Sequence, residues 1–256
     1  MQRNLEYLGL VLKISKVGEG HALVNFFVDG REGEGEKLIT AMFYGLKKSK
    51  KNYGLRQFQT GRVWLYFNPV NQTYKVMDFQ ATSLREGLSK SLVRIWSASF
   101  ASELVFKFHG NCNFVLVNGF LDGIALCTDE ECRFALLRFL VRVLNVSGVL
   151  PPVKTCGVCG LEFLVANDAG KKAFFNKMNY EFYCERCLAG NVENTADLIS
   201  ISPESQSFLL AVLNEPTNVS RKIVLSRFAE NEVRSFLFFL LQRLVGRMKT
   251  LEAGIL

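Results

Sequence analysis

The sequence lacks any apolar run long enough to cross a membrane. Its longest unbroken apolar run is 236–241, whereas a membrane-spanning helix needs about 20 such residues. Residues 1–20 also lack the features of a signal peptide, because their short apolar run at 8–12 is followed closely by Lys13 and Lys16. We therefore expect a cytoplasmic globular protein with no membrane contact, and 256 residues with 49% hydrophobic content suffice for two domains.

Histidine is scarce, and cysteine is present in an odd number. The chain has two histidines, His21 and His109, and seven cysteines. An odd count in a reducing compartment disfavours a disulfide framework and favours metal binding. We interpret Cys112, Cys127 and Cys132 as ordinary small residues of the core or its boundary. The sequence also lacks internal repeats and low-complexity segments.

The other four cysteines form two CxxC pairs, Cys156 with Cys159 and Cys184 with Cys187, 24 residues apart. Zinc takes four tetrahedral ligands, and a two-residue gap lets both thiolates of one tight turn face the same ion. A glycine follows each cysteine of the first pair, and glycine tolerates the positive φ that such a turn needs. The spacing predicts one structural zinc ion held by these four residues. Two disulfides or chance spacing are the alternatives.

A hairpin is predicted between the two pairs. Residues 161–165 and 180–183 are apolar and β-prone, and residues 167–170 have turn chemistry. The gap is longer than the roughly 15–20 residues usual for such sites, which leaves room for a lysine-bearing excursion at 171–177.

Positive charge is concentrated at the N-terminal end. The formal net charge is +7, of which residues 1–82 supply 12 Lys+Arg against 7 Asp+Glu, or +5. A basic surface favours a polyanionic partner, although it also serves solubility.

Residues 1–82 have the pattern of a small barrel. Five β-rich runs are expected, at 7–14, 22–28, 37–44, 61–67 and 73–82. A barrel of this size is most commonly an OB-fold, which binds oligonucleotides. The glycine-rich loop at 29–36 lacks the GxxxxGK[ST] pattern and carries three glutamates, so it is not a phosphate cradle. In the fourth run Trp64 and Tyr66 alternate with Leu65 and Phe67, so one pair faces the core and the other faces outward.

A basic cluster follows the third run. Its cations are Lys47, Lys48, Lys50, Lys51 and Arg56, and such a run is usually a solvated surface. A position on a barrel loop raises the nucleic-acid interpretation, in which lysines contact phosphates without reading sequence. Nearby aromatic residues offer stacking faces: Tyr44, Tyr53 and Phe58. Lys13 and Lys16 are the alternative phosphate contacts.

Helical periodicity begins at residue 83. Helices are expected at 84–108, 113–126, 128–147, 202–213 and 229–249. The third begins with a capping box formed by Thr128 and Glu131. Buried stripes are expected at 88, 92, 95, 100 and 104, at 134, 137, 141 and 144, and at 233, 237, 240, 244 and 248. The predicted fold class is therefore α+β. An N-terminal OB-fold barrel (1–82) precedes an α-helical domain (83–256), which carries the zinc hairpin as an insertion at 151–190.

This order of barrel, helical bundle and inserted four-cysteine site resembles the RecO family of bacterial DNA repair proteins. The segments that carry the resemblance are 9–13, 18–20, 45–50, 101–104, 134–140, 148–159 and 238–252. Only some members of that family keep the zinc cysteines, and this chain has all four. The acidic glycine-rich insert at 31–36 departs from the family pattern.

The resemblance implies a non-catalytic, nucleoid-associated protein. Such a protein would bind single- and double-stranded DNA and anneal complementary strands. With RecR and, more distantly, RecF, it would help to load RecA onto DNA covered by single-stranded DNA-binding protein. A lysine surface suits annealing, because it screens backbone repulsion while leaving bases free to pair.

Two competing functions follow from the cysteines. A zinc enzyme keeps an open coordination position and usually has histidine ligands, whereas His21 and His109 are far from the four cysteines in the sequence. We therefore expect no catalytic residues. A zinc ribbon that binds protein alone is the second alternative, and indifference to DNA at low salt would favour it.

Overall fold

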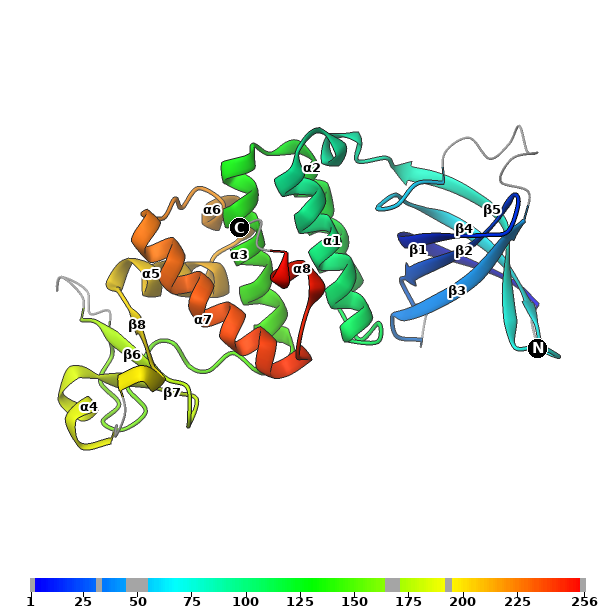
Figure 1. The fold of residues 1–256 in the computed structure, drawn as a ribbon. Coiled ribbons are helices and arrows are strands. Elements are labelled where there is room, and N and C mark those ends of the chain that lie inside the picture. The colour runs from blue at the N-terminus through cyan, green and yellow to red at the C-terminus, as the bar shows by residue number, and fades with distance from the viewer. Residues whose placement is uncertain (1–2, 31–33, 45–54, 164–170, 192–194, 254–256) are drawn as a thin grey trace. The chain divides into compact units, whose positions relative to one another are not determined.

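The computed structural model describes residues 3–30, 34–44, 55–163, 171–191 and 195–253. The chain forms two compact units (Figure 1). The first comprises Met1–Cys132 and Met248–Leu256, and the second comprises Arg133–Arg247. Among the residues described, no helix is both long enough and apolar enough to cross a membrane.

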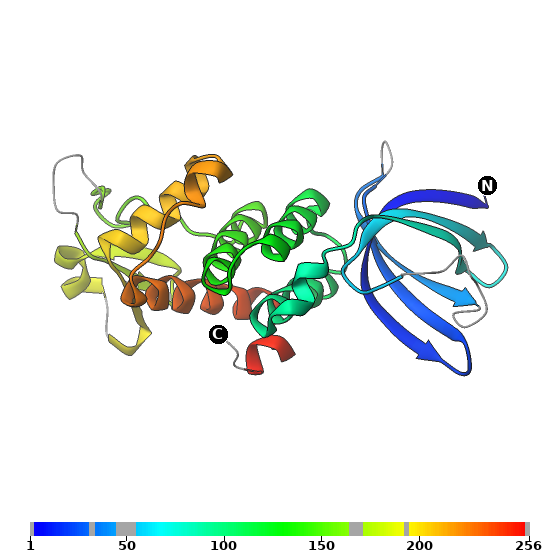
Figure 2. The same cartoon turned by 90° about the horizontal axis from the view of Figure 1, so that it is seen from above.

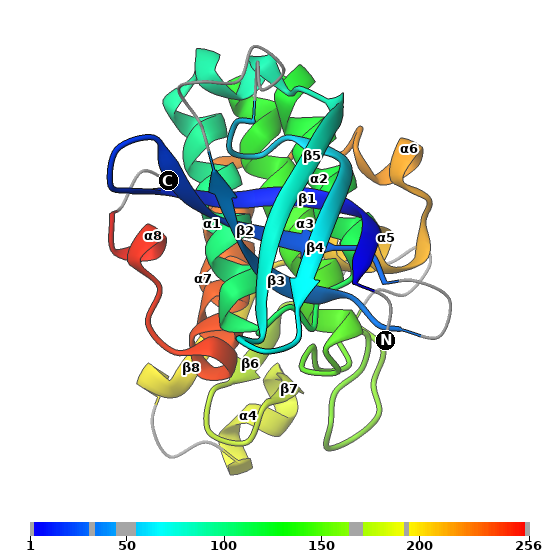
Figure 3. The ribbon, with the colours of Figure 1, turned by 90° about the vertical axis from the view of Figure 1, so that its right-hand side faces the viewer.

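A five-stranded closed barrel forms the N-terminal part of the first unit. Its strands are β1 (Asn4–Val17), β2 (His21–Val28), β3 (Lys37–Tyr44), β4 (Thr60–Asn68) and β5 (Thr73–Ser83). Their order around the barrel is β1-β2-β3-β5-β4, and the short parallel pair of β3 with β5 closes it (Figure 3). This is the topology of an OB-fold, so the predicted barrel is confirmed.

Strand β4 shows how alternation fills the barrel. Val63, Leu65 and Phe67 are buried, whereas Trp64 and Tyr66 are half-buried and face outward. A strand sends successive side chains to opposite faces, so an apolar residue at every second position makes a core. Leu65 packs in one cluster with buried residues from each of the other four strands, including Tyr7, Phe26, Phe43 and Val76.

Helices complete the first unit. They are the 3-10 turn η1 (Glu86–Lys90), α1 (Leu92–Lys107), α2 (Phe114–Leu126), the first turn of α3 (Asp129–Val146), and α8 (Lys249–Glu252). The prediction of one helix over 84–108 was wrong. Ser91 interrupts it with an extended backbone, and its Oγ accepts from the N–H groups of Val93 and Arg94. Leu92 and Ile95 are consequently exposed rather than part of a buried stripe.

The capping box of α3 is confirmed. The Glu131 N–H donates to Thr128 Oγ1 (3.2 Å), and the Thr128 N–H donates to Glu131 Oε2 (2.7 Å). The predicted stripe at 134, 137, 141 and 144 is buried. Arg138 on the same helix is buried as well.

The second unit contains the rest of α3, a small sheet and more helices. Its further elements are β6 (Ala173–Asn176), β7 (Glu181–Cys184), α4 (Glu185–Asn191), η2 (Thr195–Asp197), β8 (Leu198–Ile201), α5 (Pro203–Asn214), α6 (Thr217–Ser220) and α7 (Arg227–Val245). Figure 2 shows α5 and the long α7. Ser205 Oγ of α5 donates a hydrogen bond to Glu232 Oε2 of α7 (2.7 Å).

Two predictions for this unit need correction. Strand β7 pairs with β6 rather than with 161–165, and β8 adds a third strand on the other side of β6. Within 161–165, residues 161–163 contribute one isolated bridge, between Thr155 and Glu162, while 164–165 and the turn at 167–170 lie outside the described residues. The last long helix ends at Val245, because Gly246 has a positive φ of 71°. Leu244 is therefore partly exposed, and Met248 is buried outside this helix.

Candidate metal centre and nucleic-acid surface

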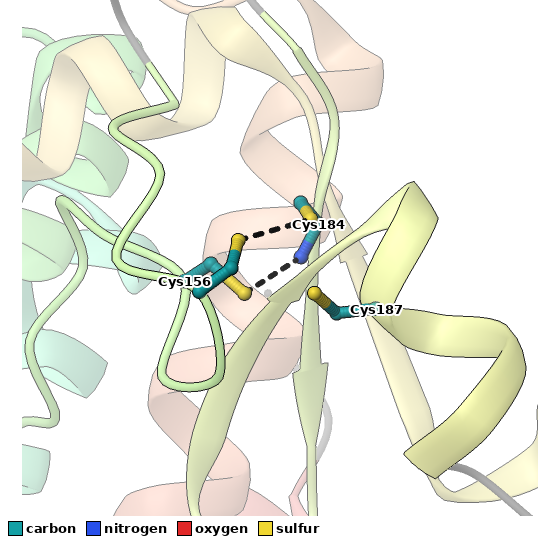
Figure 4. A group of neighbouring side chains, drawn as sticks. Cys156, Cys184 and Cys187 are labelled. Carbon is teal, nitrogen blue, oxygen red and sulfur yellow. Dashed lines mark hydrogen bonds between the residues drawn. The ribbon is translucent and has the colours of Figure 1, made fainter.

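The four cysteines of the two CxxC pairs lie together. Cys156 and Cys159 belong to a tight loop, Cys184 ends β7, and Cys187 lies in the first turns of α4. Their four sulfur atoms all lie within 4.8 Å of one another. Figure 4 shows the side chains of Cys156, Cys184 and Cys187 directed toward one another.

Backbone hydrogen bonds shape the loop and fix it to β7. The Gly160 N–H donates to the Cys156 carbonyl (2.9 Å), and the Cys156 N–H donates to the Leu161 carbonyl (2.9 Å). Gly160 has a φ of 69°, which side chains rarely adopt. The Gly157 N–H donates to the Phe182 carbonyl of β7 (2.8 Å). These hydrogen bonds hold the first CxxC pair beside the second.

Hydrogen bonding makes the thiols unequal. Burial alone would raise the pKa of Cys156, but hydrogen bonds from the backbone of Cys159, Cys184 and Val158 lower that pKa to about 6. The contact from Cys184 is an N–H donated to Cys156 Sγ at 3.5 Å. Hydrogen bonds with Cys159 and Cys184 raise the pKa of Cys187 to about 12. Hydrogen bonding therefore favours the thiolate at Cys156 and the neutral thiol at Cys187.

The sulfur spacing fits a tetrahedral metal ion. Two thiolates about 2.3 Å from a tetrahedral centre lie about 3.8 Å apart. Cys159 Sγ and Cys184 Sγ are 3.8 Å apart. Among the described residues, the cluster contains no histidine or carboxylate, and four sulfur donors would complete the coordination shell. The arrangement is compatible with a metal site that supports the fold.

An aromatic core lies beside the metal centre. The ring of Phe182 on β7 packs 5.3 Å from that of Phe175 on β6 and 5.4 Å from that of Phe236 on α7. Phe163 directly follows Glu162 of the bridge that closes the loop, and its ring centroid lies 6.4 Å from that of Phe182. A metal that fixes the loop would therefore also fix the packing of β7 against α7.

The predicted DNA contacts are placed only in part. Lys13 and Lys16 are exposed on β1, where they pair with Asn25 and Ala22 of β2. Arg56 is exposed just before β4. The other predicted cations, Lys47, Lys48, Lys50 and Lys51, lie outside the described residues. The assignment of these residues to DNA binding therefore stays a prediction.

The predicted stacking residues differ in their exposure, and one of the three lies outside the described residues. Tyr44 is exposed at the end of β3. Phe58 is only 5% exposed, so it belongs to the core and its prediction as a stacking face was wrong. Tyr53 lies outside the described residues. Sequence reasoning missed His21 and Lys75, which both contact the Tyr44 ring.

Residues 90–252 match the family model described as "Recombination protein O C terminal". The chain belongs to the RecO family. The match covers most of the helices and the four-cysteine cluster, and the barrel precedes it. RecO membership gives the chain a role in DNA recombination and repair, with DNA and proteins of the recombination pathway as its general class of partners. A search of curated proteins found no match.

Proposed function

We propose that this RecO protein is a non-catalytic recombination mediator. It binds single- and double-stranded DNA and anneals complementary strands. Together with RecR and RecF, it promotes loading of RecA onto DNA coated by single-stranded DNA-binding protein. The observation that carries this proposal is the RecO family match at 90–252 directly behind a five-stranded OB-type barrel.

The two parts of the chain have different proposed roles. We assign DNA binding to the barrel domain at 1–82, since OB-folds hold oligonucleotides. The helical domain at 83–256 carries the metal hairpin as an insertion at 151–190. The basic barrel end favours phosphate contacts, because lysines gain affinity by displacing counterions without reading bases.

The proposal includes one structural zinc ion, held by Cys156, Cys159, Cys184 and Cys187. An all-sulfur tetrahedral donor set is typical of structural zinc. When bound, the ion supplies cross-linking rather than reactivity, because four thiolates leave no position for water. The chain's own contribution is to bring the second pair beside the first through the hydrogen bond from Gly157 to Phe182.

Annealing of coated strands tests the function. Complementary strands are covered with their cognate single-stranded DNA-binding protein, and the rate of duplex formation is followed with and without the purified protein. We expect acceleration at low salt that fades as salt rises, because counterion release drives the binding. Strands carrying only single-stranded DNA-binding protein are the control.

A zinc-ribbon scaffold is the second candidate. The exposed Val158 between Cys156 and Cys159 favours it, since an apolar residue at the tip of such a turn offers a protein contact. Full zinc content with no DNA binding at low salt would support this scaffold and reject the mediator.

A further inference from the structure

The barrel presents two outward-facing aromatic clusters with opposite electrostatic surroundings. The Tyr44 face consists of His21, Tyr44 and Lys75, and the Trp64 face consists of Glu6, Trp64 and Asp78. In each, an aromatic ring stands on the solvent side of a strand whose alternate residues fill the core. The charges beside each ring decide which one a polyanion approaches.

The Tyr44 face is assembled from three strands. Tyr44 ends β3 and is 52% exposed. His21 lies opposite Tyr44 in the β2–β3 pair, and its ring meets the tyrosine edge-on, with centroids 5.1 Å apart at 70°. Lys75 reaches it from β5, with Nζ 5.4 Å from the ring centroid. The parallel pairing of Met42 with Lys75 brings this strand alongside (Figure 3).

The same solvent side continues along the sheet. Met42, two positions before Tyr44, lies opposite Leu23. Thr40, four positions before Tyr44, lies opposite Asn25. Asn25 in turn lies opposite Lys13 of β1. Residues between these positions, such as Ala22 and Phe43, point into the core. The face therefore runs across β1, β2, β3 and β5 with a lysine near each end, at Lys75 and Lys13.

The Trp64 face is acidic. Trp64 Nε1 donates to Glu6 Oε2 (3.0 Å), and Glu6 lies opposite Trp64 in the β1–β4 pair. Asp78 lies opposite Trp64 on the other side, in the β4–β5 pair. Two cations flank this face: Arg62, whose Nη1 lies 3.7 Å from Glu6 Oε1, and Lys75, which lies opposite Tyr66 in the β4–β5 pair. Two carboxylates beside the ring would repel a phosphate chain from this face.

We propose that Tyr44 is the residue of the barrel on which a base of single-stranded nucleic acid stacks. Lys75 and His21 lie beside the phosphates of that strand, and the Trp64 face stays outside its path. The proposal rests on the proposed DNA binding and adds the feature that selects unpaired bases. Aromatic stacking is tolerant of sequence because every base has a π-face. In a duplex those faces are occupied by neighbouring base pairs, so duplex gains only the cationic contacts.

Binding to three DNA probes of equal length tests this assignment. The probes are a single-stranded oligothymidine, an abasic strand with the same number of phosphates, and a duplex. Fluorescence anisotropy is measured at one fixed salt concentration for the full-length wild type and for Tyr44→Ala, Tyr44→Phe and Trp64→Ala. Because Tyr44 is largely exposed, thermal unfolding should be unchanged in its variants, and this is checked first.

The expected result is selective. Tyr44→Ala should weaken binding of oligothymidine by roughly 5- to 150-fold, the range of one lost base stack. Its affinities for the abasic strand and the duplex should stay within about twofold of wild type, because phosphate contacts dominate those complexes. Tyr44→Phe keeps a π-face and should bind oligothymidine like wild type. Trp64→Ala is the matched control, because it removes the other outward ring, and it should change none of the three affinities.

Other results overturn the proposal in distinguishable ways. Equal losses on all three probes would mean that Tyr44 supports the surface rather than stacks on bases. Wild-type affinity in Tyr44→Ala would remove the residue from the path, and a loss confined to Trp64→Ala would place the strand on the acidic face. If the wild type binds none of the probes, the proposed DNA-binding function fails together with this inference.

Discussion

At the scale of single residues, Cys156 of the cluster and Cys112 outside it differ in what surrounds the sulfur. Cys156 accepts a backbone N–H from Cys184 and has a pKa lowered to about 6. Cys112 is instead desolvated by burial and lies near Glu36, which together raise its pKa to about 12. Backbone hydrogen bonds therefore favour the thiolate of Cys156, whereas burial and Glu36 favour the neutral thiol of Cys112.

This contrast leads to a substitution test of the metal centre. Cys156→Ser and Cys184→Ser should each lose the metal, because three sulfur donors and a hydroxyl bind zinc much more weakly than four thiolates. Structural zinc contributes an apparent ~10–16 kcal/mol of coupled folding free energy in small zinc domains, so the hairpin should also unfold at lower temperature. Metal content is measured by mass spectrometry, and stability is measured by thermal unfolding.

Cys112→Ser is the matched control for these two variants. Cys112 is half-buried and lies outside the four-sulfur cluster, so its variant should keep one ion per chain. Unchanged metal content in Cys156→Ser or Cys184→Ser would refute the assignment of those ligands.

At the scale of elements, one buried arginine joins the barrel to α2. Arg85, in the left-handed region just before η1, donates to the Phe58 carbonyl (2.5 Å) and Thr60 Oγ1 (2.9 Å) of the barrel. It also donates to Asn118 Oδ1 (2.7 Å) and Asp122 Oδ1 (2.8 Å) of α2. Its side chain is 1% exposed. Burial lowers the pKa of Arg85, and the ion pair with Asp122 opposes that shift.

Arg85→Ala should therefore destabilise the first unit by about 2–4 kcal/mol, since it removes the hydrogen bonds of a buried side chain, including the one to the buried Phe58 carbonyl. The free energy of unfolding is measured with urea. Arg62→Ala is the control, because its ion pair with Glu6 at 3.7 Å is exposed and should contribute less than about 1 kcal/mol. Equal losses in the two variants would show that the Arg85 network does not join these elements.

The elements also show which parts of the fold can be predicted from the sequence. Long strands with period-two burial were predicted within a few residues, and β3 was predicted at its observed bounds, Lys37–Tyr44. Helix caps such as Thr128 with Glu131 are local and were predicted as well. The partner of β7 was not predicted. Apolar segments of four or five residues are too short to show a periodicity, so the sequence does not distinguish 161–165 from Ala173–Asn176 as the partner strand. The break at Ser91 was missed because Leu84, Leu88 and Leu92 keep the spacing of four that is typical of a helix through this segment.

The candidate sites also differ in how far they can be predicted from the sequence. The metal cluster could be predicted because each CxxC pair is a local feature and the doubled spacing is specific. The surroundings of Tyr44 could not, because Lys75 comes beside it only through the parallel pairing of β3 with β5. Strand partners across a barrel closure are set by the whole sheet and not by residues near each other in the sequence. Phe58 was misassigned for a related reason, since its burial depends on the segment before β4 folding back to Val11, which accepts from its N–H (2.7 Å).

At the scale of the whole molecule, the net charge of +7 is unevenly distributed. Residues 1–82 carry +5 and the remaining residues carry +2. A positive potential at one end raises the local concentration of a polyanion and speeds its association, and salt screens this effect. The salt dependence of DNA affinity therefore reports how many of these cations contact phosphates.

Charge reversal at Lys47 and Lys48 tests the basic segment as the main phosphate contact. The double variant Lys47→Glu/Lys48→Glu should weaken binding of all sequences alike, because lysine–phosphate contacts carry no sequence information. Each lost contact should reduce the slope of log affinity against log salt by roughly 0.7 on single strands. The slope is measured by titrating one oligonucleotide at several salt concentrations.

A charge-matched control separates contact from net charge. Lys90→Glu/Lys107→Glu changes the net charge by the same amount, from two exposed positions on η1 and α1 that lie outside the basic segment. A general electrostatic effect would lower affinity equally in both double variants, whereas direct contact predicts a flatter slope only for the change at 47 and 48. If the slope stays at its wild-type value in that variant, the phosphate path runs elsewhere, and Lys13 and Lys16 on β1 are the next positions to reverse.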